Sequence, residues 1–184
     1  IPPLHAGWTT RRKSQHFDAY SEVARGFASV MDIDPWLIDP LYDVCSDINF
    51  QERAGEECLA TRVGALLARI REKYAQHGVD HEPFVIVKAD AGTYGMGIMT
   101  VRDPSEVVGL NRKQRNKMAV VKEGLEVSSV LIQEGVPTFE SVDGGAAEPV
   151  VYMMDRYVVG GFYRVHGERG IDENLNAPGM HFKP

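Results

Sequence analysis

The stretch between residues 83 and 101 constrains the fold more than any other part of the sequence. Residues 84–88 are a short run of β-forming residues that follows a proline and ends in Lys88. A loop rich in glycine comes next, and residues 97–101 form a second run of β-forming residues. This pattern predicts two antiparallel strands joined by a flexible glycine-rich loop.

A lysine beside glycines is a pattern that suits anion binding. Glycine allows backbone N–H groups to approach an anion closely, and lysine supplies a point charge for a phosphate. The Gly-Lys-Ser/Thr order of a P-loop is missing, and a strand follows instead of a helix, which also excludes a Rossmann turn. Lys88, Gly92, Gly95 and Gly97 therefore suggest a flap over nucleotide phosphates. A glycine-rich hairpin with an edge lysine is the alternative.

The chain reads as two parts, a helical portion over residues 1–82 and a strand-rich portion over residues 83–184. Apolar residues at helical spacing predict helices over 17–30 and 59–74, and we expect both apolar stripes to lie in the core. Asp34 before a proline predicts a short helix that ends at about residue 38.

The second part contains further strand signals. Strands are predicted over 129–133, 149–154 and 157–165, with a tight turn between the last two. Gly160–Gly161 suggests either a bulge or a close approach of another backbone segment. Asp103 before a proline predicts the start of another helix. The fold class is therefore α+β, with antiparallel hairpins preceded by a helical segment.

Composition narrows the function classes. A net charge of -6 argues against a large basic surface for nucleic acid, and no apolar run reaches the length of about 20 residues that spans a bilayer. Cys45 and Cys58 are expected to be reduced thiols of a cytoplasmic protein, and a catalytic thiol is the alternative. Association with a second copy of the chain stays open. The missing initial methionine and the abrupt end suggest a segment of a longer protein.

Residues 130–140 are a second candidate site. An apolar strand ends in Gln133 and Glu134 and turns through Gly135, Val136 and a proline. Exposed backbone groups there would pair with an adenine edge, and Glu140 would accept hydrogen bonds from ribose hydroxyls. Taken alone, the segment is equally typical of a simple strand end and turn.

Two arginine-containing segments complete the candidate set. Strand alternation would point Arg164 into a cleft, where a guanidinium suits a carboxylate or an acyl phosphate; a surface salt bridge is the alternative. The basic cluster that begins with Arg11 and Arg12 is either a second carboxylate site or a solvated turn.

The order of these features resembles the ATP-grasp superfamily over about residues 83–165. The resemblance implies that Lys88 and the flap glycines bind phosphates, that residues 133–136 hold adenine and that Glu140 binds ribose. Such enzymes usually have a second nucleotide-binding lysine, for which Lys73 is the nearby candidate. The hairpin that ends in Arg164 resembles the glutathione-synthetase-like branch. This resemblance implies that Asn174 and Asn176 lie in a loop that lines the substrate site. The alternative is that they belong to a pair of Mg²⁺ ligands, and we favour the loop.

Three longer stretches are more specific. IPPLHAGWTTRRKS at the start, KADAGTYGMG from Lys88 and DRYVVGGFYRVH from Asp155 resemble the proteobacterial glutamate–cysteine ligase family with an ATP-grasp-like fold. This resemblance covers essentially the whole chain. It implies ATP- and Mg²⁺-dependent joining of the glutamate γ-carboxyl to the cysteine amine through an acyl phosphate. Lys88 and Arg164 would act on the reacting groups, with Arg11 and Arg12 holding a substrate carboxylate.

Three alternatives to this function remain. The chain resembles other carboxylate–amine ligases as well, such as a glutathione-synthetase-like enzyme. A nucleotide-binding segment without catalysis would also fit, because the strands that normally carry the metal ligands are absent and the metal ligands are unknown. An adaptor that binds no nucleotide is the third.

Overall fold

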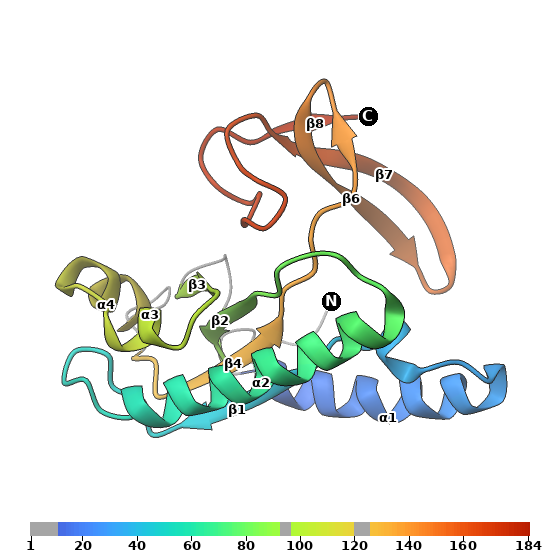
Figure 1. Cartoon of the computed structure of the whole chain (residues 1–184). Helices are drawn as coiled ribbons and strands as arrows, with labels where there is room; N and C mark the ends of the chain where they lie inside the picture. Colours follow the sequence, from blue (N-terminus) through green and yellow to red (C-terminus); the bar gives the residue numbers. More distant parts are fainter. Residues whose placement is uncertain (1–10, 93–96, 120–125) are drawn as a thin grey trace. The chain divides into compact units, whose positions relative to one another are not determined.

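The computed structural model describes residues 11–92, 97–119 and 126–184 (Figure 1). The chain divides into two compact units, Ile1–Gly135 and Val136–Pro184. The first unit contains helices and a four-stranded sheet, and the second contains a separate four-stranded sheet. All the strand pairs within the two sheets are antiparallel, which confirms the predicted α+β class.

The sheet of the first unit has the strand order β1-β4-β2-β3. Its strands are β1 (Tyr42–Ser46), β4 (Ser129–Glu134), β2 (Val85–Ala89) and β3 (Ile98–Val101). The predicted hairpin is confirmed, because β2 and β3 pair with Lys88 opposite Ile98. The sequence did not predict β1, a strand of five residues that pairs along β4.

The strand order of this sheet explains why the first unit extends along the chain to Gly135. β4 lies between β1 and β2, so one sheet takes strands from both sides of the boundary expected at residue 82. That boundary falls inside the first unit. Pairing between strands that are far apart in the sequence, rather than local composition, holds the unit together.

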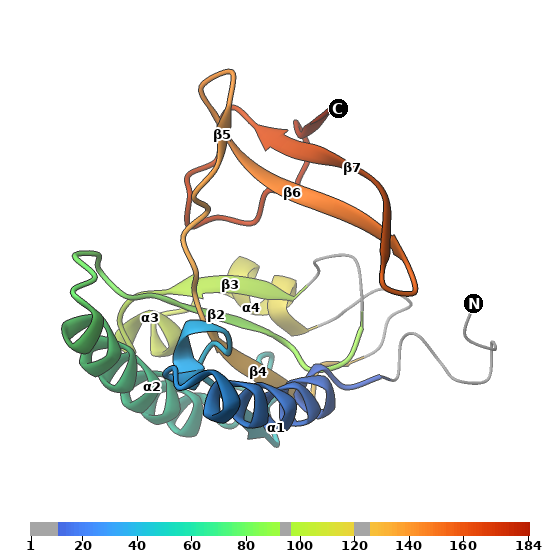
Figure 2. The same cartoon turned by 90° about the vertical axis from the view of Figure 1, so that its right-hand side faces the viewer.

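Helix α2 (Glu56–His77) runs along the sheet and supplies much of the core (Figures 1 and 2). Its apolar residues recur at helical spacing, and Gly78 ends it with a φ of 66°. The helix and its apolar stripe are as predicted. Its buried residues are Glu56, Leu59, Ala60, Val63, Leu66, Leu67, Ile70 and Tyr74.

Helix α1 (Lys13–Met31) is where predicted, but its buried face is not. Tyr20, Val23, Phe27 and Val30 are 44% to 84% exposed, whereas the small side chains of its other face, at Ser21, Ala24 and Ala28, are buried. Small residues allow close approach of a neighbouring element, so the helix packs through them. The expectation that the large apolar stripe lies in the core of this unit is therefore wrong.

Three short helices complete the first unit. η2 (Pro35–Leu37) is the short helix expected after Asp34, whose carboxylate accepts a hydrogen bond from Trp36 N at 3.0 Å. α3 (Ser105–Val108) and α4 (Arg112–Ala119) follow β3. None of the helices in the described residues is long and apolar enough to cross a membrane.

The second unit is a sheet with the order β5-β6-β7-β8. The strands are β5 (Ser141–Val142), β6 (Gly145–Met154), β7 (Tyr157–His166) and β8 (His181–Lys183). The predicted hairpin of β6 and β7 is confirmed. A register shift between Tyr152 and Met153 places one extra residue of β7 next to Gly160, which confirms the predicted bulge.

Candidate functional site

The side chain of Lys88 is the centre of the candidate site in the first unit. It projects near the end of β2, and its Nζ donates a hydrogen bond of 2.5 Å to Gln133 Oε1 on the neighbouring strand β4. Burial, and secondarily the charge of Lys13, lowers the pKa of Lys88 from 10.5 to about 8. The structure therefore brings together two predicted residues, Lys88 and Gln133.

Lys13 is a neighbour of Lys88 that the sequence placed in the basic cluster with Arg11 and Arg12, as part of a carboxylate site. Its Nζ donates to Ala89 O at 2.7 Å and to Gly92 O at 3.0 Å, so it binds the backbone on which the glycine loop begins. Burial lowers the pKa of Lys13, and the charge of Asp90 opposes this shift. The sequence signal was only a basic cluster 76 residues away from Ala89.

Asp90 connects the same loop to helix α1. This carboxylate is 1% exposed and accepts hydrogen bonds of 2.8 Å from Ser14 N and Ser14 Oγ. A carboxylate at the first turn of a helix satisfies a free N–H group and interacts favourably with the helix dipole. The start of α1 and the start of the glycine loop are therefore one hydrogen-bonded structure.

Aromatic side chains border the Lys88 ammonium. Its Nζ lies 5.4 Å from the centroid of the Phe17 ring, and that ring lies 5.0 Å from the ring of Tyr42. An ammonium over an aromatic face is stabilised electrostatically. Phe17 was predicted only as an apolar residue of the core, so its contact with Lys88 is new.

The flap glycines are partly described. Gly92 and Gly97 have φ values of 91° and 62°, which residues with a side chain rarely adopt, and Ala89 N donates to Gly97 O at 3.0 Å. Both glycines therefore have a conformational reason to be where they are. Gly95 lies outside the described residues.

The predicted adenine-binding turn needs a correction. Glu134 N donates to Leu41 O and Gly135 N donates to Phe84 O, so neither N–H group is free. The side chain of Glu134 is buried and accepts hydrogen bonds from Trp36 Nε1 and Leu41 N, and burial raises its pKa. Glu134 of β4 therefore holds Trp36 of η2 and Leu41, the residue before β1. These contacts form because β4 lies beside β1 in the sheet.

Val136 is the first residue of the second unit and is exposed. Within that unit, Arg164 Nη1 donates to Glu148 Oε1, which lies directly opposite on β6. Arg164 Nε is buried and has no hydrogen-bond partner among the described residues. Glu140 precedes β5, and its carbonyl oxygen accepts a hydrogen bond from Ala147 N. The ion pair expected as the alternative for Arg164 is therefore present.

The remaining predicted residues are exposed. Asn174 and Asn176 lie in the loop between β7 and β8, where Asn176 N donates to Asn174 Oδ1 at 3.0 Å. Arg11 lies just before α1, and Arg12 is the N-cap residue without a side-chain capping bond. Within the described ranges, no group of three His, Cys, Asp or Glu side chains could hold a metal ion.

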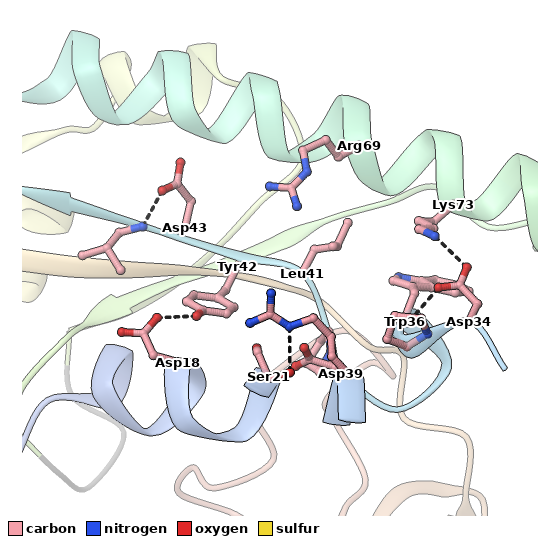
Figure 3. A pocket seen from close by; sticks show the side chains of 14 residues that line it. Asp18, Ser21, Asp34, Trp36, Asp39, Leu41, Tyr42, Asp43, Arg69 and Lys73 are labelled. Atoms are coloured by element: carbon pink, nitrogen blue, oxygen red, sulfur yellow. Dashed lines mark hydrogen bonds and ion pairs between the residues drawn. The ribbon is translucent and has the colours of Figure 1, made fainter. Parts of the chain in front are cut away.

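A cavity of about 490 Å³ lies between α1, β1 and α2 in the first unit (Figure 3). Arg69 and Lys73 line it from α2, and Asp18, which accepts a hydrogen bond from the Tyr42 hydroxyl, lines it from α1. Lys73 forms an ion pair of 2.6 Å with Asp34. The lysine whose charge lowers the pKa of Lys88 is Lys13, not Lys73. A nucleotide-binding role for Lys73 stays a prediction.

Comparison with known proteins places the chain in a family. The family model described as "GshA: Glutamate-cysteine ligase" matches residues 1–184. The chain belongs to the glutamate–cysteine ligase family. A crystal structure from Methylobacillus flagellatus, described as a gamma-glutamylcysteine synthetase, is 67% identical to this family member, with a TM-score of 0.86. A search of curated proteins found no match.

That structural match covers 100% of this chain and 43% of the other chain. This member of the glutamate–cysteine ligase family therefore spans less than half the length of its solved relative. The resemblance drawn from the sequence motifs is confirmed at the level of the family.

The ion pairs of Asp34 give this ligase-family chain a pH-dependent stability. Hydrogen bonds from Lys73 and then His77 hold the pKa of Asp34 below its usual value of 3.8. A carboxylate with a depressed pKa stabilises the fold above its unfolded pKa and loses that contribution as the pH falls through the folded pKa. We expect Asp34→Asn to lower the free energy of unfolding by about 1 kcal/mol at pH 7.

Thermal unfolding measured from pH 7 down to pH 2 tests this expectation. The difference in Tm between the native protein and Asp34→Asn should shrink below about pH 4, where the carboxylate begins to be protonated in the unfolded chain. Asp80→Asn is the control, because Asp80 is exposed. Parallel curves for the native protein and Asp34→Asn over the whole range would contradict the role of the ion pairs.

Proposed function

We propose that this chain is the nucleotide-binding part of an ATP-dependent glutamate–cysteine ligase with an ATP-grasp-like fold. The observation that carries the proposal is the half-buried ammonium of Lys88 at the root of the glycine loop. Burying a lysine costs stability, as the lowered pKa of Lys88 indicates. A phosphate would supply the negative charge that this ammonium lacks, and family membership indicates which phosphate to test first.

In the proposed reaction, ATP gives its γ-phosphoryl group to the γ-carboxylate of glutamate. The amine of cysteine then attacks the acyl phosphate, and inorganic phosphate leaves as the amide forms. Such chemistry depends mainly on positioning and charge neutralisation. Lys88 would bind phosphate oxygens, while Lys13 and Asp90 would fix the start of the glycine loop that covers them.

The other predicted residues keep the roles proposed for them from the sequence. Gln133 would orient the Lys88 ammonium through its present hydrogen bond. Glu134 would act through its backbone carbonyl, because its carboxylate is used inside the first unit. Val136 would complete the adenine contact, and Glu140 would accept from the ribose hydroxyls. The substrate carboxylates would be bound by arginines and asparagines: Arg11, Arg12, Arg164, Asn174 and Asn176.

Arg164 is the residue best prepared to receive an anion in the second unit. Glu148 binds one end of its guanidinium, and the buried Nε has no partner among the described residues. A carboxylate or acyl phosphate would offer that Nε an acceptor. Among the described residues, no group of three His, Cys, Asp or Glu side chains is placed to hold Mg²⁺. The reaction would take place in the cytoplasm.

The release of ADP tests the proposed substrates. A polypeptide of the length of the solved relative should release ADP with glutamate plus cysteine. It should release much less with γ-glutamylcysteine plus glycine, the substrates of a glutathione-synthetase-like enzyme. The reverse preference would replace the proposed substrates. If the 184-residue chain binds ATP but releases no ADP, nucleotide binding belongs to this chain and catalysis needs the additional residues. Failure of both polypeptides to bind ATP would contradict the proposal.

A further inference from the structure

The two cysteines of the chain lie in contact with each other. Cys45 Sγ and Cys58 Sγ are 3.5 Å apart, although the two residues are 13 positions apart in the sequence. Cys45 is on β1 and is 1% exposed, whereas Cys58 is exposed in the first turn of α2. These are the two cysteines of the sequence, so the fold has paired all of its thiols.

The two thiols have different chemical surroundings. Arg62 lies one helical turn after Cys58 and forms an ion pair with Asp43. The interaction of the Arg62 guanidinium with the sulfur is the largest cause that lowers the pKa of Cys58, and burial is the largest cause that opposes it. Burial raises the pKa of Cys45 to about 12. A thiolate is the reactive form of cysteine, and exposure gives reagents access. Cys58 therefore has the properties of an attacking thiol and Cys45 those of a resolving thiol.

We propose that Cys45 and Cys58 are a site of reversible oxidation, at which a hydroperoxide converts the two thiols to a disulfide that links β1 to α2. The sulfur separation of 3.5 Å leaves a short approach to the S–S bond length of about 2 Å. The exposed side chain of Cys58 has room to make this approach. The inference does not depend on the proposed ligase activity.

The reaction balances in two steps. The Cys58 thiolate attacks one oxygen of the peroxide, the O–O bond breaks, and the leaving oxygen takes a proton to become water or an alcohol. Cys58 is then a sulfenic acid. The Cys45 sulfur attacks that sulfur, the S–O bond breaks, and water leaves with the Cys45 proton. The two thiols lose two electrons in total, which reduce the peroxide, and an external dithiol reverses the change.

The disulfide would form on the strand that pairs with Gln133. Cys45 lies opposite Val130 of β4, and Tyr42 of the same strand lies opposite Gln133. Gln133 accepts the hydrogen bond from Lys88. Oxidation would thus covalently link helix α2 to β1, the edge strand of the sheet that carries Gln133 and Lys88.

Oxidation of the folded protein by one equivalent of hydrogen peroxide tests the proposal. We expect both free thiols to disappear together, the monomer to lose the mass of two hydrogen atoms, and dithiothreitol to restore both thiols. Peptide mapping should show Cys45 joined to Cys58. In Cys45→Ala, a sulfenic acid should persist on Cys58 and react with dimedone, whereas Cys45 should stay reduced in Cys58→Ser.

The role of Arg62 gives a second measurement. Arg62→Met should slow oxidation several-fold at pH 7, because the thiolate of Cys58 loses its stabilising partner. Arg71→Met, an exposed arginine of the same helix, is the matched control and should oxidise at the native rate. The proposal is overturned if the native protein accumulates dimedone-reactive Cys58 without forming the bridge, or if its disulfides link two chains. Mapping of the native protein decides this even if the Cys45 variant does not fold.

Discussion

Replacing Gly135 by alanine should lower the stability of the first unit by about 3 kcal/mol, which corresponds to a fall in Tm of roughly 6–12 °C. A Cβ at this position would lie 2.0 Å from Cε2 of the Phe84 ring, far inside van der Waals contact. Phe84 is 2% exposed, so the ring has little room to move. Gly135 is also tied to Phe84 through the hydrogen bond from its N–H to Phe84 O. Thermal unfolding followed by circular dichroism measures the loss.

A second substitution separates the clash from other causes. In a Phe84→Leu background the ring is absent, and Gly135→Ala should then cost much less, so that the two changes are strongly non-additive. Gly26→Ala is the matched control, because no heavy atom lies within 4 Å of the added Cβ in the middle of α1. It should stabilise the protein by up to about 1 kcal/mol. An unchanged Tm for Gly135→Ala would mean that Phe84 does not pack on Gly135.

Replacing Lys88 by methionine should lower the rate of ADP release by about 100-fold or more, the effect typical of removing a group that stabilises the transferred charge. The measurement uses a polypeptide of the length of the solved relative. Methionine keeps the apolar stem but removes the half-buried ammonium. Because burial lowers the pKa of Lys88, the charged lysine costs stability at pH 7, and Lys88→Met should unfold at the same temperature or a higher one.

The pH dependence of stability provides an internal check on this lysine. A lysine whose pKa falls from 10.5 to about 8 on folding makes the native protein more stable as the pH rises between those values, because the unfolded chain binds more protons. Lys88→Met should lack that rise. Lys113→Met, an exposed lysine of α4, is the control and should keep both the activity and the rise. Full activity of Lys88→Met would show that Lys88 does not bind the phosphates.

Much of the secondary structure was predictable because local patterns specify it. The apolar spacing of α2, the two strands around the glycine loop, and the β6–β7 hairpin with its bulge follow from periodicity and turn residues. The face of α1 that packs was not predictable from the same rule. The large apolar residues and the small residues of that helix both recur at helical spacing. Which set is buried depends on the element packed against the helix, and here the small set is buried.

The candidate site was predictable in part. Lys88 and Gln133 were identified separately, and the structure joins them by a hydrogen bond. Glu134 was expected to offer free backbone groups, but its N–H and its side chain are used to hold Leu41. A sequence shows that a strand ends near a residue; it does not show that a second strand, here β1, covers that end.

By itself, the sequence determined the α+β class, the positions of its main helices and hairpins, and the family, because residues close together in the chain carry those signals. Only the tertiary structure decided that Lys13 lies next to Lys88, that Glu134 is buried against Trp36, and that the two cysteines touch. The hydrogen bond of Lys13 to Ala89 O joins residues 76 positions apart, and that of Trp36 to Glu134 joins residues 98 positions apart. No local pattern encodes such pairings, because they form only when the strands of one sheet come together and bury the residues between them.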